Sequence, residues 1–147
     1  MKVRRQARIV AMQALFEIDM TSHDPATVLN ERFADKELPP EGEAFARALV
    51  TGTLAHRQEI DALIARVAPE WPVDQIAGVD RAILRLAIYE IVFDGTTSPK
   101  VVINEAVELA KLFGSDSSRR FVNGALGALV AQLPDLSAQA SALRHEG

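Results

Sequence analysis

Residues 79–93, VDRAILRLAIYEIVF, make up the most apolar helical stretch of the chain. On a helix drawn over them, apolar side chains fall on nearly every side. Such a helix is normally buried among other elements, so the stretch predicts the central helix of the fold. Glu90 stands within it and needs a partner for its charge. We expect Arg81, Arg85 or an arginine elsewhere to pair with it, in preference to a catalytic role.

Towards the N-terminus, residues 3–20 repeat apolar side chains at spacings of three and four, which is typical of a helix. One face carries small residues between Ala7 and Ala14 and suits close packing. A second stripe, from Ile9 to Met20, is either sandwiched between two layers or exposed as an apolar and cationic surface. Because large apolar groups usually lie in the core, we expect most of this stripe to be covered.

Three further segments carry signals for the start of a helix. Asp24-Pro25 and Ser98-Pro99 each combine a capping side chain with a proline in the first turn. They predict helices beginning there, the second of which ends at Gly114. The serines between Ser115 and Ser118 are expected to cap a last helix that extends to about residue 133.

An apolar seam over residues 41–67 predicts one long helix. Gly52 lies on this seam and is expected to admit a close neighbour. His56, also on the seam, is expected to be partly buried and hydrogen-bonded.

The chain therefore predicts an all-α fold of six or seven helices in one domain, because no sustained strand pattern is present. The domain is expected to cover residues 1–133, with a junction between two helical subbundles near 69–78. Residues 134–147 hold few large apolar side chains and are expected to be a weakly ordered tail.

Composition excludes several classes of function. The 147 residues include no cysteine, which rules out disulfides, thiolate metal sites and a cysteine nucleophile. No run of about 18 apolar residues could span a membrane, and the N-terminus lacks a secretory pattern, so we expect a cytoplasmic protein with no membrane partner. The three histidines are far apart and predict no metal site, and the serines are explained as caps. We find no catalytic constellation and predict neither an enzyme nor a cofactor.

The cationic charge is concentrated although the net charge is −4. Residues 1–16 contain Lys2, Arg4, Arg5 and Arg8 and no acidic residue. A phosphate is attracted by the electrostatic potential of nearby charges more than by the net charge of the chain, because at ordinary salt charges are screened beyond about 10 Å. Two interpretations stay open at this point: an RNA-binding surface, or a solvated helix start that aids solubility.

A second cationic segment opens the predicted last helix. Arg119 and Arg120 precede Phe121 there, so two cations, an aromatic ring and free backbone N–H groups occur together. This combination suits phosphate contact and base stacking. Alternatively, the arginines are solvated and the phenylalanine is core. The two cationic segments form one surface only if the first and last helices are neighbours.

Three stretches of the chain are distinctive: ARIVAMQALFE around residues 8–16, RAILRLAIYE over 81–90, and PKVVINEAVELAKLFGSDSSRRFVNGAL over 99–126. Together they resemble the NusB family of bacterial transcription antitermination factors. Their order and spacing match the family from the basic start to about residue 133, and the third stretch is highly specific.

The resemblance implies an all-α fold of two perpendicular subbundles without enzymatic activity. It implies binding to the boxA element of ribosomal RNA leader transcripts together with the ribosomal protein NusE, in a complex that joins RNA polymerase and suppresses premature termination. Some family members are thought to form homodimers, which could cover the arginine-rich face.

The resemblance also assigns site residues by position. Phe16 replaces a tyrosine of well-known relatives, which removes a hydroxyl and keeps a ring for stacking. Asp80 matches an acidic family position at the start of the central helix, with Arg81 and Leu84 nearby, and these three are the implied partner-binding residues. The implied RNA-binding residues are Lys2, Arg4, Arg5, Arg8, Gln13, Phe16, Arg119, Arg120 and Phe121.

Two competing interpretations keep the fold and change the role. NusB-like domains also accompany RNA 5-methylcytosine methyltransferases, but those enzymes need a cysteine, which is missing here. The other alternative is a stand-alone helical scaffold that binds proteins and has no RNA role.

Overall fold

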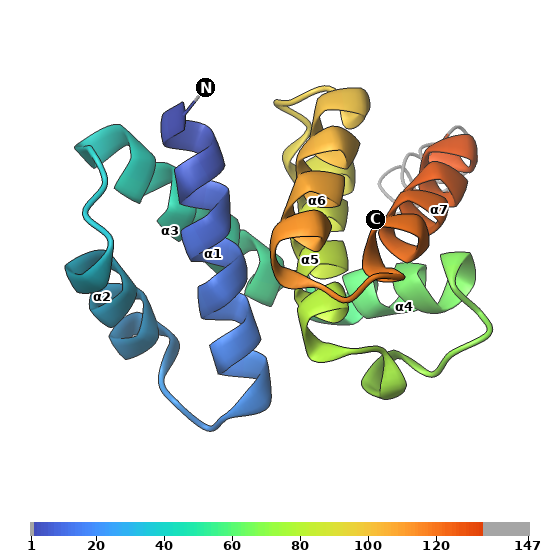
Figure 1. Ribbon diagram of the computed structural model, residues 1–147, viewed down its shortest axis with the longest axis horizontal. Coiled ribbons are helices and arrows are strands. Elements are labelled where there is room, and N and C mark those ends of the chain that lie inside the picture. Colours follow the sequence, from blue (N-terminus) through green and yellow to red (C-terminus); the bar gives the residue numbers. More distant parts are fainter. Residues whose placement is uncertain (1, 134–147) are drawn as a thin grey trace, which may run out of the picture.

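The computed structural model describes residues 2–133 and contains no strand within them (Figure 1). Seven α-helices and two short helical segments follow one another, which confirms the all-α prediction. The predicted tail, 134–147, lies outside the described residues. The elements are α1 (Lys2–Met20), α2 (Pro25–Asp35), α3 (Pro40–Ala55), α4 (Arg57–Val67), η1 (Val73–Gln75), α5 (Gly78–Ile88), η2 (Tyr89–Asp94), α6 (Pro99–Phe113) and α7 (Ser118–Ala131).

The helices form two groups that share α5. Helix α1 packs against α2, α3 and α5, whereas α5 also packs against α4, α6 and α7. Figure 1 shows α1–α3 on one side of the molecule and α4–α7 on the other, with α6 lying along α5. The segment 68–77, which contains η1, connects α4 to α5.

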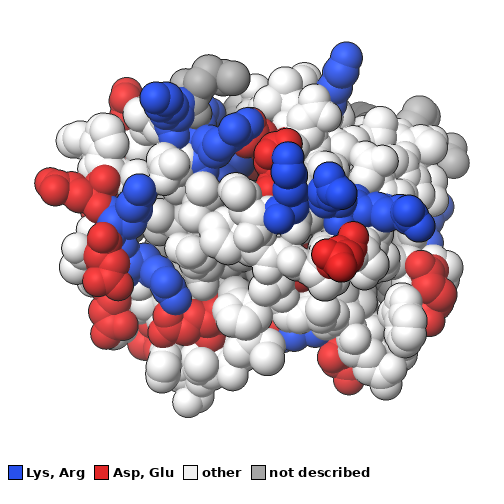
Figure 2. All heavy atoms as spheres, in the orientation of Figure 1, with Lys and Arg blue, Asp and Glu red and all other residues white. Residues whose placement is uncertain are grey.

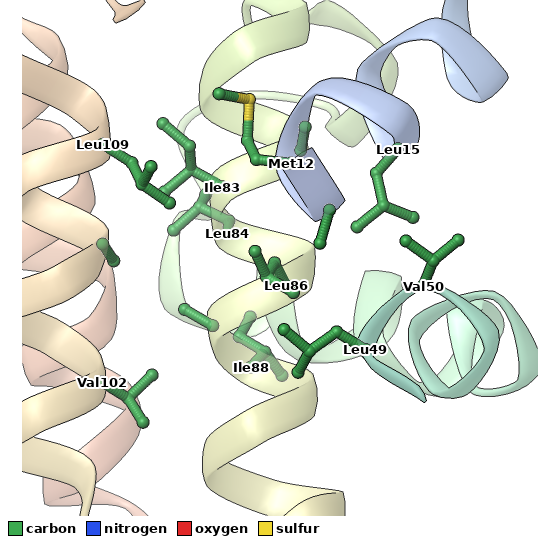
Figure 3. Close-up of a cluster of buried hydrophobic side chains, with 14 of the residues drawn as sticks. Met12, Leu15, Leu49, Val50, Ile83, Leu84, Leu86, Ile88, Val102 and Leu109 are labelled. Atoms are coloured by element: carbon green, nitrogen blue, oxygen red, sulfur yellow. The ribbon is translucent and has the colours of Figure 1, made fainter. Parts of the chain in front are cut away.

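Helix α5 is the central helix that its sequence predicts. Every residue from Asp80 to Ile88 is buried. Figure 3 shows Leu84 and Leu86 of α5 beside Met12 of α1 and Leu49 of α3, and these side chains come from three helices far apart in sequence. A single apolar core therefore joins the two groups.

The predicted capping signals are right for two helices and wrong for a third. The Asp24 carboxylate accepts a hydrogen bond from the Thr27 N–H at 3.1 Å. The Ser98 hydroxyl accepts one from Val101 N–H. Ser117 stands before α7 but makes no capping bond with its side chain. The Ser118 hydroxyl instead accepts from the backbone N–H of Ser115, so the serines order the turn before α7.

The single helix predicted over residues 41–67 is divided into α3 and α4 at His56. The His56 backbone leaves helical geometry, with φ −109° and ψ 18°. Its ring stacks on Phe93 with 4.1 Å between centroids, and its Nδ1 lies 3.0 Å from a Glu59 carboxylate oxygen. His56 is thus partly buried and hydrogen-bonded as predicted, but it ends one helix and begins the next.

Gly52 on α3 has the close neighbour that its position predicts. The Tyr89 ring occupies the space where a Cβ at residue 52 would lie. This contact brings α3 against η2, the segment that continues α5.

The second stripe of α1 is covered over most of its length. Met12 is buried, and Ile9 and Phe16 are partly buried and pack against the core. Met20, at the end of the helix, is 55% exposed. The prediction of a sandwiched helix holds except at this last residue. None of the helices within residues 2–133 combines the length and apolar character needed to cross a membrane.

Candidate nucleic-acid interface

Arg8 does not lie on the surface, contrary to the role expected for it. Its side chain is 6% exposed and forms a bidentate ion pair with Glu90, with N–O distances of 2.9 and 2.8 Å. The buried Glu90 thereby receives the arginine partner that it requires, from α1 rather than from Arg81 or Arg85. Because the Arg8 guanidinium is enclosed and neutralised by Glu90, it is not available to a phosphate.

The remaining cations at the start of α1 are exposed and point in different directions. Lys2 and Arg4 are both exposed. The Arg4 guanidinium lies over the ring of Phe45 on α3, 4.3 Å from its centroid. This cation–π contact orients Arg4 toward the α1–α3 side of the molecule.

Arg5 points to the opposite side, toward α6. Its Nε and Nη2 each lie 3.1 Å from an oxygen of Glu105. The hydrogen bond and the charge of Glu105 raise the pKa of Arg5. About half of the Arg5 side chain stays exposed, at 47%. Since a guanidinium has five N–H donors and Glu105 occupies two of them, donors remain for another anion.

The start of α1 and the start of α7 meet across α6 in an open groove of about 690 Å³, which we call the arginine groove. Two segments separated by more than 110 residues thus contribute to one surface, as the RNA-binding hypothesis requires. The groove is lined by Arg5, Asn104, Val107, Glu108, Asp116, Arg119, Arg120 and Asn123.

Figure 2 shows the charge distribution over this face of the molecule. Lys and Arg side chains gather over its upper half, across the region of α1, α6 and α7 in Figure 1, with a few acidic side chains among them. Asp and Glu side chains lie mainly along the left and lower parts. A chain of net negative charge therefore gathers its Lys and Arg side chains over one part of this face, with acidic side chains among them.

The sequence pattern did not identify the amides and carboxylates of the arginine groove. Asn104 on α6 and Asn123 on α7 are both exposed there. Asparagine is a poor helix former, so an asparagine in the interior of a predicted helix is a signal that the sequence carried at both positions.

A second hollow, of about 360 Å³, lies beside the start of α7, and we call it the Asp80 hollow. It joins Phe121, expected at the RNA surface, to Asp80, expected at the partner surface. Phe121 is partly buried and packs against the core as well. The lining residues are Trp71, Gln75, Ile76, Ala77, Asp80, Ser115, Ser117 and Phe121.

Asp80 is a buried acidic residue of this hollow, and one of its carboxylate oxygens lacks a hydrogen-bond partner within residues 2–133. It is 7% exposed, and its Oδ1 has no hydrogen-bond partner among the described residues. A buried acceptor that lacks a donor costs free energy, on the order of 1–3 kcal/mol.

The other two residues expected at the partner surface are interior. Leu84 is completely buried in the core, so it cannot contact a partner. Arg81 is buried and binds Asp19 at 2.9 and 2.7 Å. Its Nη1 also donates to three backbone carbonyls, those of Val73, Asp74 and Ile76. Arg81 therefore fixes the segment before α5 against α1, and its guanidinium is fully used within the fold.

Asp19 binds a second arginine, with 3.1 Å between its carboxylate and Arg85. Burial acts to raise the pKa of Asp19, but hydrogen bonds from Arg81 and Arg85 outweigh it and hold the pKa below its usual range. Arg85 in turn binds Asp61 on α4, so α1, α4 and α5 are linked by charge.

Gln13 and Phe16 lie farther along α1 and are partly buried. The Phe16 ring packs beside Gly78 at the start of α5. Neither residue lines the arginine groove or the Asp80 hollow. Within residues 2–133, no group of three or more His, Asp or Glu side chains is arranged to hold a metal ion.

Comparison with known proteins places this geometry in a family. The family model described as the NusB family matches residues 5–131. The transcription antitermination protein NusB of Roseiflexus sp. (strain RS-1) is 51% identical over 132 residues, which cover 88% of this chain and 93% of that protein. The corresponding protein of Dehalococcoides mccartyi (strain CBDB1) is 40% identical, over 92% of this chain and 95% of its own length.

Solved structures agree with these relatives. A chain in the crystal structure of antitermination factors NusB and NusE in complex with dsRNA has a TM-score of 0.81 and 29% identity, covering 87% of this chain and 96% of its own. The solution structure of NusB from Aquifex aeolicus has a TM-score of 0.79 and 28% identity, covering 92% of this chain and 93% of its own. Since the family model spans almost all described residues and relatives reach half identity, the chain belongs to the NusB family.

Proposed function

We propose that this protein is an RNA-binding transcription antitermination factor, which binds boxA-type ribosomal leader RNA together with NusE and suppresses premature termination during rRNA transcription. The observation that carries the proposal is the arginine groove, in which Arg5 from one end of the chain meets Arg119 and Arg120 from the other. The names of the relatives and the NusB–NusE–dsRNA structure support it.

The RNA contacts are divided between two kinds of residue. Arg5, Arg119 and Arg120, with Lys2 and Arg4 at the margin, bind phosphates. Phe121 offers its ring at the edge of the Asp80 hollow, where a base can stack. Arg8 has a supporting role, since it fixes the helix that carries the other cations.

NusE binds at the Asp80 hollow in this proposal. A donor group of NusE approaches the Asp80 carboxylate, whose enclosed Oδ1 has no hydrogen-bond partner within residues 2–133. Trp71, 54% exposed, and Met20, 55% exposed, offer apolar contact near the segment 68–78. The two surfaces adjoin at the start of α7, so RNA and NusE can be bound side by side, and the complex can then join RNA polymerase.

The test is a titration of boxA-containing RNA and of a scrambled RNA, each with and without NusE, at two salt concentrations. We expect NusE to tighten binding to boxA RNA more than to scrambled RNA. Equal, weak binding of both RNAs in the presence of NusE would overturn the assignment. Binding of NusE without any RNA binding would favour the protein-binding scaffold. Light scattering at several concentrations checks whether a homodimer covers the arginine groove.

A further inference from the structure

The lining of the arginine groove is mixed in charge, which is unusual for a surface that only follows phosphates. Three arginines line it, but so do the carboxylates of Glu108 and Asp116, and Glu105 lies alongside on Arg5. Carboxylates repel phosphates at short distance, so they would weaken a surface that binds only the phosphate backbone.

Amides and carboxylates are instead the groups that bind the edges of bases. An asparagine side chain offers a donor and an acceptor in one plane, and it pairs with the amino group and ring nitrogen of adenine. A carboxylate accepts from the amino group of cytosine. In single-stranded RNA these edges are free, because an unstacked base exposes its Watson–Crick and Hoogsteen sides.

Two asparagines reach the groove from different helices. Asn104 belongs to α6 and Asn123 to α7, and both side chains are exposed. Alanine at either position would favour the helix more, by roughly 0.5 kcal/mol. The fold therefore gives no reason for an amide at either place, whereas a ligand in the groove does.

We propose that the arginine groove holds one unstacked base of single-stranded RNA and that Asn104 and Asn123 read its edge. The base bears an exocyclic amino group, as adenine, cytosine and guanine do, because Glu108 and Asp116 offer acceptors beside the amides. Arg5, Arg119 and Arg120 hold the flanking phosphates. This inference rests on the proposed RNA-binding function and adds to it the residues that select sequence.

The experiment combines protein variants with a series of boxA RNAs, each abasic at one position, measured with NusE present. For the wild-type protein, one abasic RNA that has lost an adenine, cytosine or guanine is expected to bind about 10-fold more weakly, an effect within the range of one base contact. Asn104→Ala and Asn123→Ala are expected to weaken binding of intact boxA RNA by a similar factor. Each variant should then bind that abasic RNA as tightly as it binds intact boxA RNA. The slope of log affinity against log salt is expected to stay unchanged, since no phosphate contact is removed.

Gln58→Ala is the matched control, because Gln58 is an exposed helical amide on α4 outside the groove. It should keep the full abasic sensitivity. Thermal melts verify that all three variants are folded. The asparagine variants could instead prefer boxA RNA over scrambled RNA as strongly as wild type does, and lose as much affinity as wild type at every abasic position. In that case this inference is wrong and the proposed function stands. Wild-type protein that fails to prefer boxA RNA over scrambled RNA would overturn both.

Discussion

Arg8 of α1 and Glu90 of η2 form a bidentate ion pair in the interior, with both side chains almost completely enclosed. The pair joins the first helix to the end of the central one across 82 positions of sequence. Two arginines of one cationic segment therefore differ in role: Arg8 is used inside the fold, whereas Arg5, three residues earlier, faces the arginine groove.

Arg8→Ala is therefore predicted to affect folding and Arg5→Ala to affect RNA binding. Removing Arg8 leaves the Glu90 carboxylate buried without a partner, which lowers the free energy of unfolding by about 3–5 kcal/mol. Removing Arg5 leaves stability nearly unchanged and reduces the salt slope of RNA binding by about 0.7, the value of one phosphate contact on a single strand. Urea unfolding and salt titrations measure the two effects.

The double variant Arg8→Met/Glu90→Leu serves as the control for the ion pair. Replacing both charges by apolar groups of similar size is expected to recover most of the stability lost in Arg8→Ala. If Arg8→Ala unfolds like wild type but has a reduced salt slope, Arg8 contacts RNA and our placement of its role is wrong.

Asp19 is predicted to make stability depend on acid. Its pKa is lower in the folded protein than in the unfolded chain, so its contribution is complete above about pH 4, the ordinary carboxyl range, and is lost as the pH falls through the folded value. Asp19→Asn removes the counter-charge of Arg81 and Arg85 and is expected to destabilise the protein at pH 7 by about 3 kcal/mol. The free energy of unfolding, measured at several pH values from 7 to 3, should therefore change less for the variant than for wild type. An equal change in the two proteins would contradict the prediction.

Gly52 and Gly127 are predicted to respond in opposite directions to alanine. At residue 52 a methyl group meets the Tyr89 ring, and such overpacking costs about 1–3 kcal/mol. At residue 127, on α7, nothing lies within 4 Å of the new methyl group. Gly127→Ala should therefore stabilise the helix by about 0.5–1 kcal/mol. Thermal unfolding of both variants checks the pair, and stabilisation by Gly52→Ala would show that the α3–η2 contact is looser than described.

Glu105→Gln is predicted to raise affinity for RNA without improving selectivity. The change removes one negative charge from beside Arg5 and frees its guanidinium for phosphate. We expect boxA and scrambled RNA to bind roughly 3-fold more tightly at low salt, with the gain vanishing at high salt because exposed charges are screened. Glu59→Gln, on α4 away from the groove, is the control. A loss of affinity in Glu105→Gln would mean that Glu105 is needed to orient Arg5.

Local signals predicted the helix starts well, and tertiary contacts account for what was missed. Asp24 and Ser98 cap their helices within three residues, so their role is visible in the sequence. The break at His56 carries no proline or glycine and keeps the apolar period, so no local signal marks it. In the fold, the His56 ring stacks on Phe93, a residue far away in sequence.

The candidate site was predicted in part for the same reason. The sequence indicated that Glu90 needs an arginine, but the choice of Arg8 depends on how α1 approaches α5. Asp80 and Leu84 are one helical turn apart, yet Asp80 lines a hollow and Leu84 lies in the core. Spacing alone could not separate these two environments.

Helix α5 belongs to both groups of helices, and this limits how the chain can be divided. A fragment that ends before residue 78 would leave the faces of α1 and α3 without the apolar surface that covers them. A fragment that begins there would expose the other side of α5 to water. Neither half is therefore expected to fold as a separate unit. The two cationic segments depend on one common scaffold, and neither can be transferred to another protein without it.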